Sequence, residues 1–388
     1  MPSSDPKPRE RSLLERQFRL EWLGLGLAAL ILGGYLGWVL YTDHQRIGIE
    51  ERARLLGQSI VLERNLGGQL LAVARSLTSV RDDLPLLNRQ SNGKLLVAQR
   101  LRALTDAMPG VRTAVIVDAE GTLTASNREQ LVGQNFRERE IYTLARQGKD
   151  PAALYVSQPY KTVLGVYAVT VAKVMLDGGG EFAGAVAATL EPEYFKTLLN
   201  SVLYAPDMRA SVIHGEGKVA FRVPDPQGIV GTDLAARRGA FFIEHMKSGR
   251  DATVVEGIVA STGEVRLSVF RTVRPVGLQM DKALVAVVSR EIDALYSPWR
   301  KRSYEQGGLF GMLLLASAAG LLFYQRRKRA FERVVLALED EQIRADAQVR
   351  EHDARYRAVI ESSSDGFWVA DNEGRIRDRA PSFIVPSP

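Results

Sequence analysis

Residues 113–127 read TAVIVDAEGTLTASN, and residues 209–223 read RASVIHGEGKVAFRV. Both stretches are rich in β-branched and other apolar residues, and both break at a Glu-Gly pair. That pattern predicts two antiparallel strands joined by a tight turn. The two turns, at Glu120 and Glu216, are 96 residues apart. Because the same pattern returns at this distance, the sequence predicts an internal repeat of two similar modules.

Each predicted hairpin is followed by three further strand-like runs. They cover residues 153–158, 164–173 and 181–190 in the first copy, and residues 252–260, 264–272 and 283–289 in the second. Their alternating, β-branched composition is typical of strands with one buried face. We therefore expect two modules, over about residues 85–203 and 204–295, each with a five-stranded antiparallel sheet and helices. The predicted fold class is α+β.

A long helix is predicted in front of the first module, over residues 42–84. Five of its apolar residues fall on one heptad seam, which Ser59 and Glu63 interrupt: Leu56, Leu66, Leu70, Val73 and Leu77. A seam of this kind either packs on a sheet of the same chain or pairs with a second copy as a dimer stalk. The sequence leaves both possibilities open.

Two uncharged apolar segments are long enough to cross a membrane. Residues 22–41 read WLGLGLAALILGGYLGWVLY, and residues 307–324 read GGLFGMLLLASAAGLLFY. At about 1.5 Å per helical residue, such segments approach the ~30 Å thickness of a bilayer core. A cleaved signal peptide would have a shorter apolar run than the first segment, and the basic residues directly after the second argue against a buried core helix. We predict transmembrane helices at residues 22–41 and 304–324.

Basic residues indicate which side of the membrane each end occupies. Residues 326–329 read RRKR, and the tail before the first segment is also basic. The positive-inside rule then places residues 1–21 and the region after the second segment in the cytoplasm. Residues 300–302 read RKR and point the other way. Long translocated regions follow the rule poorly, so we expect residues 42–303 on the outer side.

Two PAS-like modules behind a long helix, framed by two membrane segments, resemble the double Cache sensor family of bacterial receptors. The resemblance covers about residues 45–295. It implies that residues 42–303 form a periplasmic sensor of a protein in the cell inner membrane. It also implies that a small molecule binds in the membrane-distal module, which is the first one here.

A partial motif bears on the ligand that the resemblance implies. In amino-acid-binding members of that family, a pocket helix carries an Arg-x-aromatic-aromatic pattern, and a later strand carries an Asp for the ligand's amine. Here Arg139-Glu140-Ile141-Tyr142 supplies the arginine and the second aromatic residue. Ile141 stands at the first aromatic position, and Thr189 stands near the Asp position. The implied ligand is an amino acid or a carboxylate.

Seven residues are candidates for that pocket: Arg139, Tyr142, Tyr155, Ser157, Tyr160, Tyr167 and Thr170. Arginine can hold a carboxylate through two parallel hydrogen bonds. Tyr155 and Ser157 lie two residues apart on a predicted strand, so they face the same side. Tyrosine rings can wall a pocket, but core packing would use them equally well, and Arg139 would also serve as a solvated helix arginine.

Residues 325–355 are predicted to form a cytoplasmic coiled-coil helix. One seam follows alternating 4–3 spacing through four heptads: Phe331, Val335, Leu338, Gln342, Ala345, Val349, His352, Tyr356 and Val359. Gln342, Ala345 and His352 are poor core residues, so the coil should shift easily between two packings. We predict a parallel homodimer, which Gly33 and Gly37 would support by close packing of the first membrane helix. A single amphipathic helix on another domain is the alternative.

The sequence RYRAVIESSSDGFWVADNEGRI, residues 355–376, looks like the start of a cytoplasmic PAS domain. A PAS sheet needs five strands, whereas residues 356–388 offer at most one hairpin, so an incomplete PAS domain is expected there. The output domain that normally follows in such receptors is absent from the sequence. The chain itself is therefore not predicted to be an enzyme.

The leading interpretation is a transmembrane signal-transduction receptor that senses a small periplasmic ligand and reports to a cytoplasmic output domain outside this sequence. One alternative is a truncated enzyme, either a sensor histidine kinase or a diguanylate cyclase or phosphodiesterase. Another is a structural or partner-binding membrane protein without a ligand.

Composition excludes several other classes of protein. The 388 residues contain no cysteine, which removes disulfides, thiolate metal sites and thiol nucleophiles. The four histidines are far apart in the sequence, so we expect no metal and no cofactor. Much of the net charge of +6 flanks the membrane segments, so no nucleic-acid partner is expected. The HExxH, GxSxG and P-loop motifs are missing from the sequence.

Overall fold

The computed structural model describes residues 8–148, 150–162, 165–237, 239–362, 368–370, 373 and 376–379. The chain divides into two units. Residues 38–304 form one unit and hold both five-stranded sheets. Residues 1–37 and 305–388 form the other unit, which contains most of the first apolar segment and all of residues 307–324.

The first module is an antiparallel sheet with the strand order β2-β1-β7-β6-β3. Its strands are β1 (Val111–Asp118), β2 (Leu123–Ser126), β3 (Tyr155–Val156), β6 (Thr170–Leu176) and β7 (Phe182–Leu190). Helix α2 (Gly93–Ala107) packs against β1 and β2, and helix α3 (Glu140–Gln147) packs against β6 and β7. Side chains of β1 alternate between two cores: Ala114 and Ile116 join the large one, whereas Val115 and Val117 join the smaller one under α3.

Two short elements of the first module are absent from the sequence prediction. Strands β4 (Tyr160–Lys161) and β5 (Tyr167–Ala168) pair as a small hairpin outside the main sheet. A 3-10 helix, η1 (Glu129–Leu131), follows β2. Both lie beside the cavity described below, so they matter for the site more than for the core.

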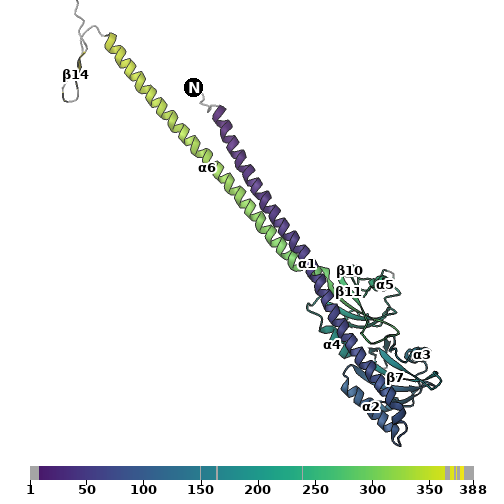
Figure 1. Cartoon of the computed structure of the whole chain (residues 1–388). Coiled ribbons are helices and arrows are strands. Elements are labelled where there is room, and N and C mark those ends of the chain that lie inside the picture. The colour runs from purple at the N-terminus through teal and green to yellow at the C-terminus, as the bar shows by residue number, and fades with distance from the viewer. Residues whose placement is uncertain are drawn as a thin grey trace, which may run out of the picture. The chain divides into compact units, whose positions relative to one another are not determined.

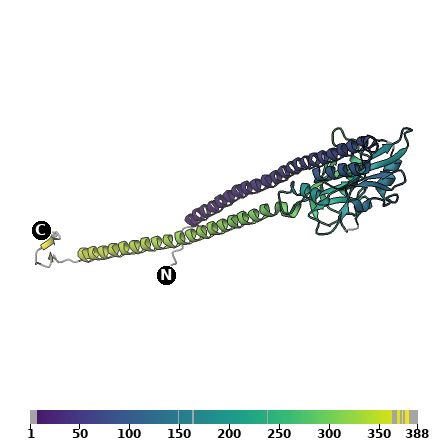
Figure 2. The same ribbon diagram turned by 90° about the horizontal axis from the view of Figure 1, so that it is seen from below.

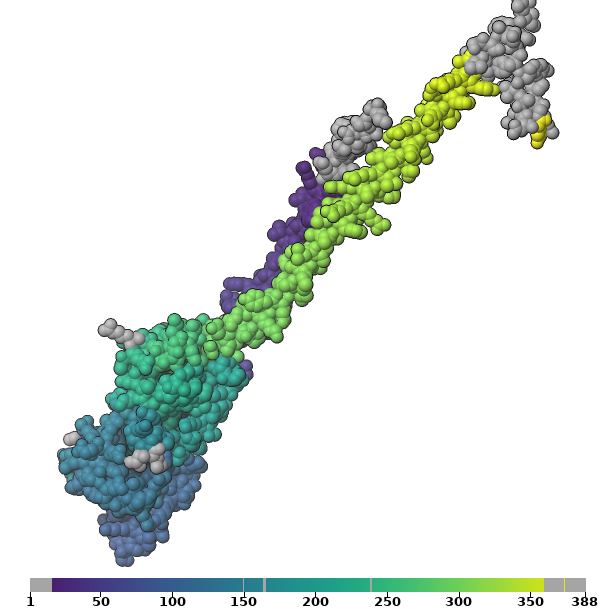
Figure 3. All heavy atoms as spheres, turned by 180° about the vertical axis from the view of Figure 1, so that it is seen from behind, coloured from purple at the N-terminus to yellow at the C-terminus, as the bar shows by residue number. Residues whose placement is uncertain are grey.

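The second module repeats the first. Its strands are β8 (Arg209–His214), β9 (Val219–Val223), β10 (Ala252–Ile258), β11 (Val265–Val273) and β12 (Leu284–Glu291). Their order, β9-β8-β12-β11-β10, matches that of the first sheet strand for strand. Helices α4 (Pro192–Asn200) and α5 (Phe241–Ser248) accompany it. Figure 3 shows the two modules, in blue and green, packed directly against each other. The predicted α+β repeat is confirmed.

Helix α1 (Pro8–Leu87) joins the two modules into one core. Figures 1 and 2 both show it lying along both sheets. Leu66, Leu70 and Leu77 on the predicted seam are fully buried in a cluster that also contains strand residues of both modules. These seam residues therefore pack on the sheets of their own chain. Ser59 interrupts it because its hydroxyl accepts a hydrogen bond from Arg271 Nε of β11 at 3.0 Å.

Among the residues that the structure describes, two helices are long and apolar enough to cross a membrane, α1 and α6 (Ile292–Ser362). Their apolar windows are not buried inside the protein. Gly33 of α1 faces the Phe310 ring of α6, where an added Cβ would lie 3.2 Å from Cζ. Gln325 Nε2 donates a hydrogen bond to Glu21 Oε2 at 2.9 Å. Small and polar residues thus hold the two helices together within one chain.

The C-terminal prediction is described only in part. Helix α6 runs unbroken through residues 325–355, the predicted coiled coil. Strands β13 (Trp368–Ala370) and β14 (Ile376–Arg379) pair as one antiparallel hairpin. The remainder of the predicted PAS segment, residues 363–367, 371–372, 374–375 and 380–388, lies outside the described residues, as do residues 1–7 of the N-terminal tail.

Candidate ligand-binding site

A cavity of about 510 Å³ lies in the first module, between its sheet and the start of α3. Its floor is made by β1, β6 and β7, where Ala172, Ala185 and Ala187 line it. Ala172 pairs with Ala187 in the sheet register, so two methyl groups stand side by side where larger side chains would fill the space. The volume is within the usual range for small-molecule sites, roughly 300–1,000 Å³.

Five of the seven predicted residues line this cavity: Arg139, Tyr142, Ser157, Tyr160 and Thr170. They come from four different parts of the first module, so the fold brings together what the sequence keeps apart. A larger hollow, of about 820 Å³, lies beside the end of α1 and is lined by Arg81, Asp82 and Lys94 among others. None of the seven predicted residues lines that hollow.

Arg139 is the residue just before α3 and is exposed to solvent. Its guanidinium carbon lies 5.4 Å from the Phe136 ring centre and 5.9 Å from that of Tyr160. Within the described part of the chain, no carboxylate forms an ion pair with it. Cations held against aromatic faces retain their charge for another partner, so Arg139 is free to bind an anion.

A row of hydroxyl groups crosses the floor beside Arg139. Tyr160 Oη lies 2.9 Å from Thr170 Oγ1, which lies 3.0 Å from Thr189 Oγ1. Ser157 Oγ accepts a hydrogen bond from the Thr170 backbone N–H at 3.0 Å. Each hydroxyl can turn to donate or accept, so the row can adapt to a carboxylate or a hydroxyl on a ligand.

Tyr142 and Tyr155 are held by the module itself. Tyr142 is buried, and its hydroxyl donates to the Ala119 carbonyl at 2.5 Å while its ring meets Phe182 edge-on. Tyr142 therefore offers the cavity its ring and not its hydroxyl. Tyr155 does not line the cavity. Its hydroxyl lies 3.2 Å from the backbone nitrogen of Asp150 and 3.3 Å from its carbonyl oxygen.

Tyr167 also does not line the cavity. Its ring lies against Gly231 of the second module, where an added Cβ would come within 2.2 Å of the ring. Gly231 has a φ of +86°, which glycine adopts without strain. Tyr167 thus packs between the modules, and a pocket role for it has no geometric support.

Four charged residues at the cavity were not among the sequence candidates: Arg112, Arg128, Glu138 and Glu140. Glu138 and Glu140 flank Arg139 in sequence, which is the only signal that could have pointed to them. Burial raises the pKa of Glu140 above its ordinary value, although a hydrogen bond with the Gln158 backbone and the charge of Lys218 oppose the shift. Three arginines and two glutamates give the cavity a small excess of positive charge.

Among the residues that the structure describes, no group of three or more His, Asp or Glu side chains is placed to hold a metal ion.

Several solved structures share this fold. The extracellular domain of rpHK1S-Z16, which is assigned to the histidine kinases, aligns with a TM-score of 0.55 and 22% identity over 65% of this chain and 98% of its own. The ligand-binding domain of the Pseudomonas fluorescens chemoreceptor CtaA, in complex with L-isoleucine, aligns at 0.48 and 18% over 66% and 99%. That of the Pseudomonas aeruginosa chemoreceptor PctC, in complex with GABA, aligns at 0.47 and 18% over 62% and 100%.

The likeness to the rpHK1S-Z16 domain confirms the predicted fold of two tandem PAS-like sheets on a long N-terminal helix. Residues 354–384 match the PAS domain family, as predicted for the C-terminal segment. No curated protein matches the sequence at a significant level.

Proposed function

We propose that this protein is a two-pass membrane receptor whose first module binds a small anionic molecule, an amino acid or a carboxylate. The observation that carries the proposal is the 510 Å³ cavity with the unpaired guanidinium of Arg139 at its wall. A cavity of this size with a few converging polar groups is the usual form of a small-molecule site.

The geometry gives each part of such a ligand a partner. Arg139 offers a fork of donors to a carboxylate. The N-terminus of α3 begins at the same wall, since Glu140 and Ile141 line the cavity, and its helix dipole favours an anion. The carboxylates of Glu138 and Glu140 can accept hydrogen bonds from an ammonium group of the ligand. Thr189 also lines the cavity, but it carries no charge and cannot form an ion pair with that group.

The membrane arrangement follows from α1 and α6. We assign residues 22–41 and 304–324 to the inner membrane, residues 42–303 to the periplasm, and both termini to the cytoplasm. Two long apolar helices and the basic run at residues 326–329 support this topology.

A homodimer with a cytoplasmic output completes the proposal. The side chains of Leu338 and Val349 are exposed on α6 and belong to the predicted seam, which a second copy would cover. The PAS family match at residues 354–384, which begins within the end of α6, supports a signalling segment there. The chain itself is proposed to carry no catalytic activity.

Calorimetry on the full chain in lipid nanodiscs tests the site. Short carboxylates and the standard amino acids are titrated into the wild type, Arg139→Gln and Arg137→Gln. Arg137 is the matched control, because it is an exposed arginine two residues away that does not line the cavity. Arg139→Gln should raise the Kd of the bound compound at least tenfold, about 1.4 kcal/mol, and Arg137→Gln should leave it unchanged. Equal affinity in all three proteins would remove Arg139 from the site.

A further inference from the structure

The second module contains a smaller cavity at the position that corresponds to the first. It has a volume of about 60 Å³ and is lined by β8, β9, β11 and β12, the counterparts of β1, β2, β6 and β7. In the first sheet Val115 pairs with Ser126, and 96 residues later Ser211 pairs with Arg222. The repeat therefore places an arginine where the first module has a serine.

Arg222 is buried without an adequate partner. Its side chain is only 9% exposed. Its Nε is shielded from water and has no hydrogen-bond partner among the described residues. Asp225 Oδ1 is the nearest carboxylate oxygen, at 3.8 Å, and it already accepts the Ile229 backbone N–H at 2.9 Å. Buried polar groups are nearly always hydrogen-bonded, so this one indicates a missing partner.

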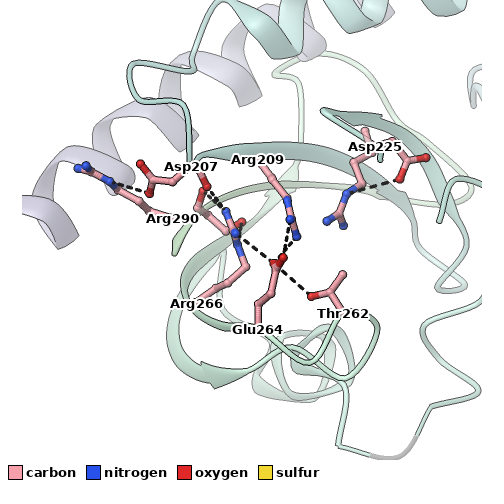
Figure 4. Close-up of polar contacts among 9 residues, drawn as sticks. Asp207, Arg209, Asp225, Thr262, Glu264, Arg266 and Arg290 are labelled. Atoms are coloured by element: carbon pink, nitrogen blue, oxygen red, sulfur yellow. Dashed lines mark hydrogen bonds and ion pairs between the residues drawn. The ribbon is translucent and has the colours of Figure 1, made fainter. Parts of the chain in front are cut away.

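Two neighbouring arginines, Arg209 and Arg266, do have hydrogen-bond acceptors for their guanidinium groups (Figure 4). Arg209 NH2 donates to Glu264 Oε1 at 2.6 Å. Arg266 donates from Nε to Ser289 Oγ at 3.1 Å, from NH1 to Glu264 Oε2 at 3.2 Å and from NH2 to the Asp207 carbonyl at 2.6 Å. Glu264 is thus shared by two arginines, and its charge acts on Arg222 only at a distance, without a hydrogen bond between them in the described part of the chain.

Two buried hydroxyl groups share the cavity with Arg222. Ser211 and Ser268 are 7% and 2% exposed, and within the described part of the chain neither hydroxyl makes a hydrogen bond. Phe270 and Val287 line the same cavity and belong to the apolar cluster under α5. One end of the cavity is therefore cationic and rich in donors, and the other is apolar.

We propose that this cavity binds a small monoanion, a carboxylate of the size of formate or acetate, between Arg222, Ser211 and Ser268. The cavity volume of about 60 Å³ is far smaller than the 510 Å³ of the first module's cavity, which favours an anion smaller than the ligand proposed there. The carboxylate accepts from the arginine and the two hydroxyls, and the methyl group of acetate meets the apolar wall.

The electrostatics agree with this assignment. Burial, together with the charge of Arg209, lowers the pKa of Arg222 to about 10. Arg222 is still protonated at neutral pH, so the module contains a buried cation that lacks full compensation. An anion bound from solution would offset the free-energy cost of burying this cation. The site also lies near the start of α6, because Ser289 lines the cavity two residues before β12 ends and α6 begins.

Saturation-transfer NMR of acetate on the full chain in nanodiscs tests the proposal. The buffer anion is gluconate, which is too large for the cavity. Arg139→Gln is used as the background because it weakens binding in the first module, and Arg222→Met in the same background shows how much of the transfer comes from this cavity. Acetate should show transfer in this background, formate should compete, and acetamide, which has the same shape without the charge, should not. No transfer to acetate or formate, or equal competition by acetamide, would overturn the proposal whether or not the first module binds a ligand.

Arg222→Met supplies the second readout, with Arg274→Met as the matched control, since Arg274 is an exposed arginine of the same module outside the cavity. Arg222→Met should weaken acetate binding at least tenfold and should not lower the unfolding temperature in gluconate, because it removes an uncompensated buried charge. Unchanged acetate binding contradicts the proposal. A lower unfolding temperature in gluconate also contradicts it, since Arg222 would then have a structural partner.

Discussion

The two arginines that face cavities, Arg139 and Arg222, differ in how much water reaches them. Arg139 is exposed, so its contribution to binding is screened and its loss leaves folding untouched. Arg222 is buried, so the same guanidinium imposes a folding cost that only a partner offsets. Identical chemistry thus has opposite consequences for stability, which is why the expected effects of their substitutions differ.

A second prediction for a single residue concerns His214 and the pH dependence of stability. Its Nε2 lies 3.3 Å from the Val156 carbonyl of the first module, and the Glu216 backbone N–H donates to its Nδ1 at 3.3 Å. Both contacts fit a neutral imidazole ring, because one ring nitrogen faces a hydrogen-bond acceptor and the other accepts a hydrogen bond. Burial lowers the pKa of His214 below its usual value of 6.5, while the Val156 hydrogen bond and Glu216 oppose the shift. The unfolded chain therefore binds a proton at a higher pH than the folded one.

The sign of the pH effect follows from linkage. The stabilisation that neutral His214 provides is complete above about pH 6.5 and is lost as the pH falls below that value. Thermal unfolding of the full chain should show a smaller loss between pH 7.5 and pH 5 for His214→Gln than for the wild type. His352→Gln, on an exposed part of α6, should leave the profile unchanged. A wild-type profile for His214→Gln would assign the pH dependence to other groups, such as the buried His245.

Among the elements, α6 leaves large apolar side chains uncovered in its C-terminal half, which we propose lies in the cytoplasm. Leu338 is 57% exposed and Val349 is 64% exposed. Single cysteines at these two positions should form disulfides across a parallel dimer much faster than one at Glu339, one residue off the seam. The chain has no native cysteine, so the background is clean. Equal rates at all three positions would contradict the coiled-coil assignment.

The sequence predicts elements better than it predicts contacts. The repeated hairpins predicted both sheets, because the alternation of apolar and polar residues along a strand determines which side chains share a face. The seam on α1 could not tell a sheet from a second copy, since Leu66 and Leu70 would be buried in either case. The β4–β5 hairpin was missed because strands of two residues leave no periodic signal.

The site shows the same limit. Alternation put Tyr155 and Ser157 on one face, but only the fold reveals that Tyr155 reaches Asp150 and not the cavity. Tyr167 was unpredictable for a different reason: its partner, Gly231, belongs to the other module. Arg139 stood out because a motif surrounded it, whereas Arg222 carries no motif and is recognised only by its missing partner.

Across the whole unit of residues 38–304, contacts connect the first cavity to the start of α6. The Val156 backbone N–H, next to the cavity residue Ser157, donates to Asp281 Oδ1 at 2.8 Å. The Leu154 backbone N–H donates to the Gln279 carbonyl at 2.8 Å. Residues 279–281 lead directly into β12, which ends where α6 begins. We therefore predict that a ligand that shifts β3 acts on β12, the strand that continues into α6.

The central claim is that a ligand outside the membrane changes α6 inside it, and a single measurement tests this. The full chain with one cysteine at Leu338 is reconstituted in nanodiscs, and its disulfide cross-linking rate is recorded with and without a pool of the standard amino acids and short carboxylates. We predict that the pool changes the rate, that Arg139→Gln abolishes the change, and that Arg137→Gln preserves it. An identical rate with and without the pool, for a protein that binds a component of it by calorimetry, would contradict the account.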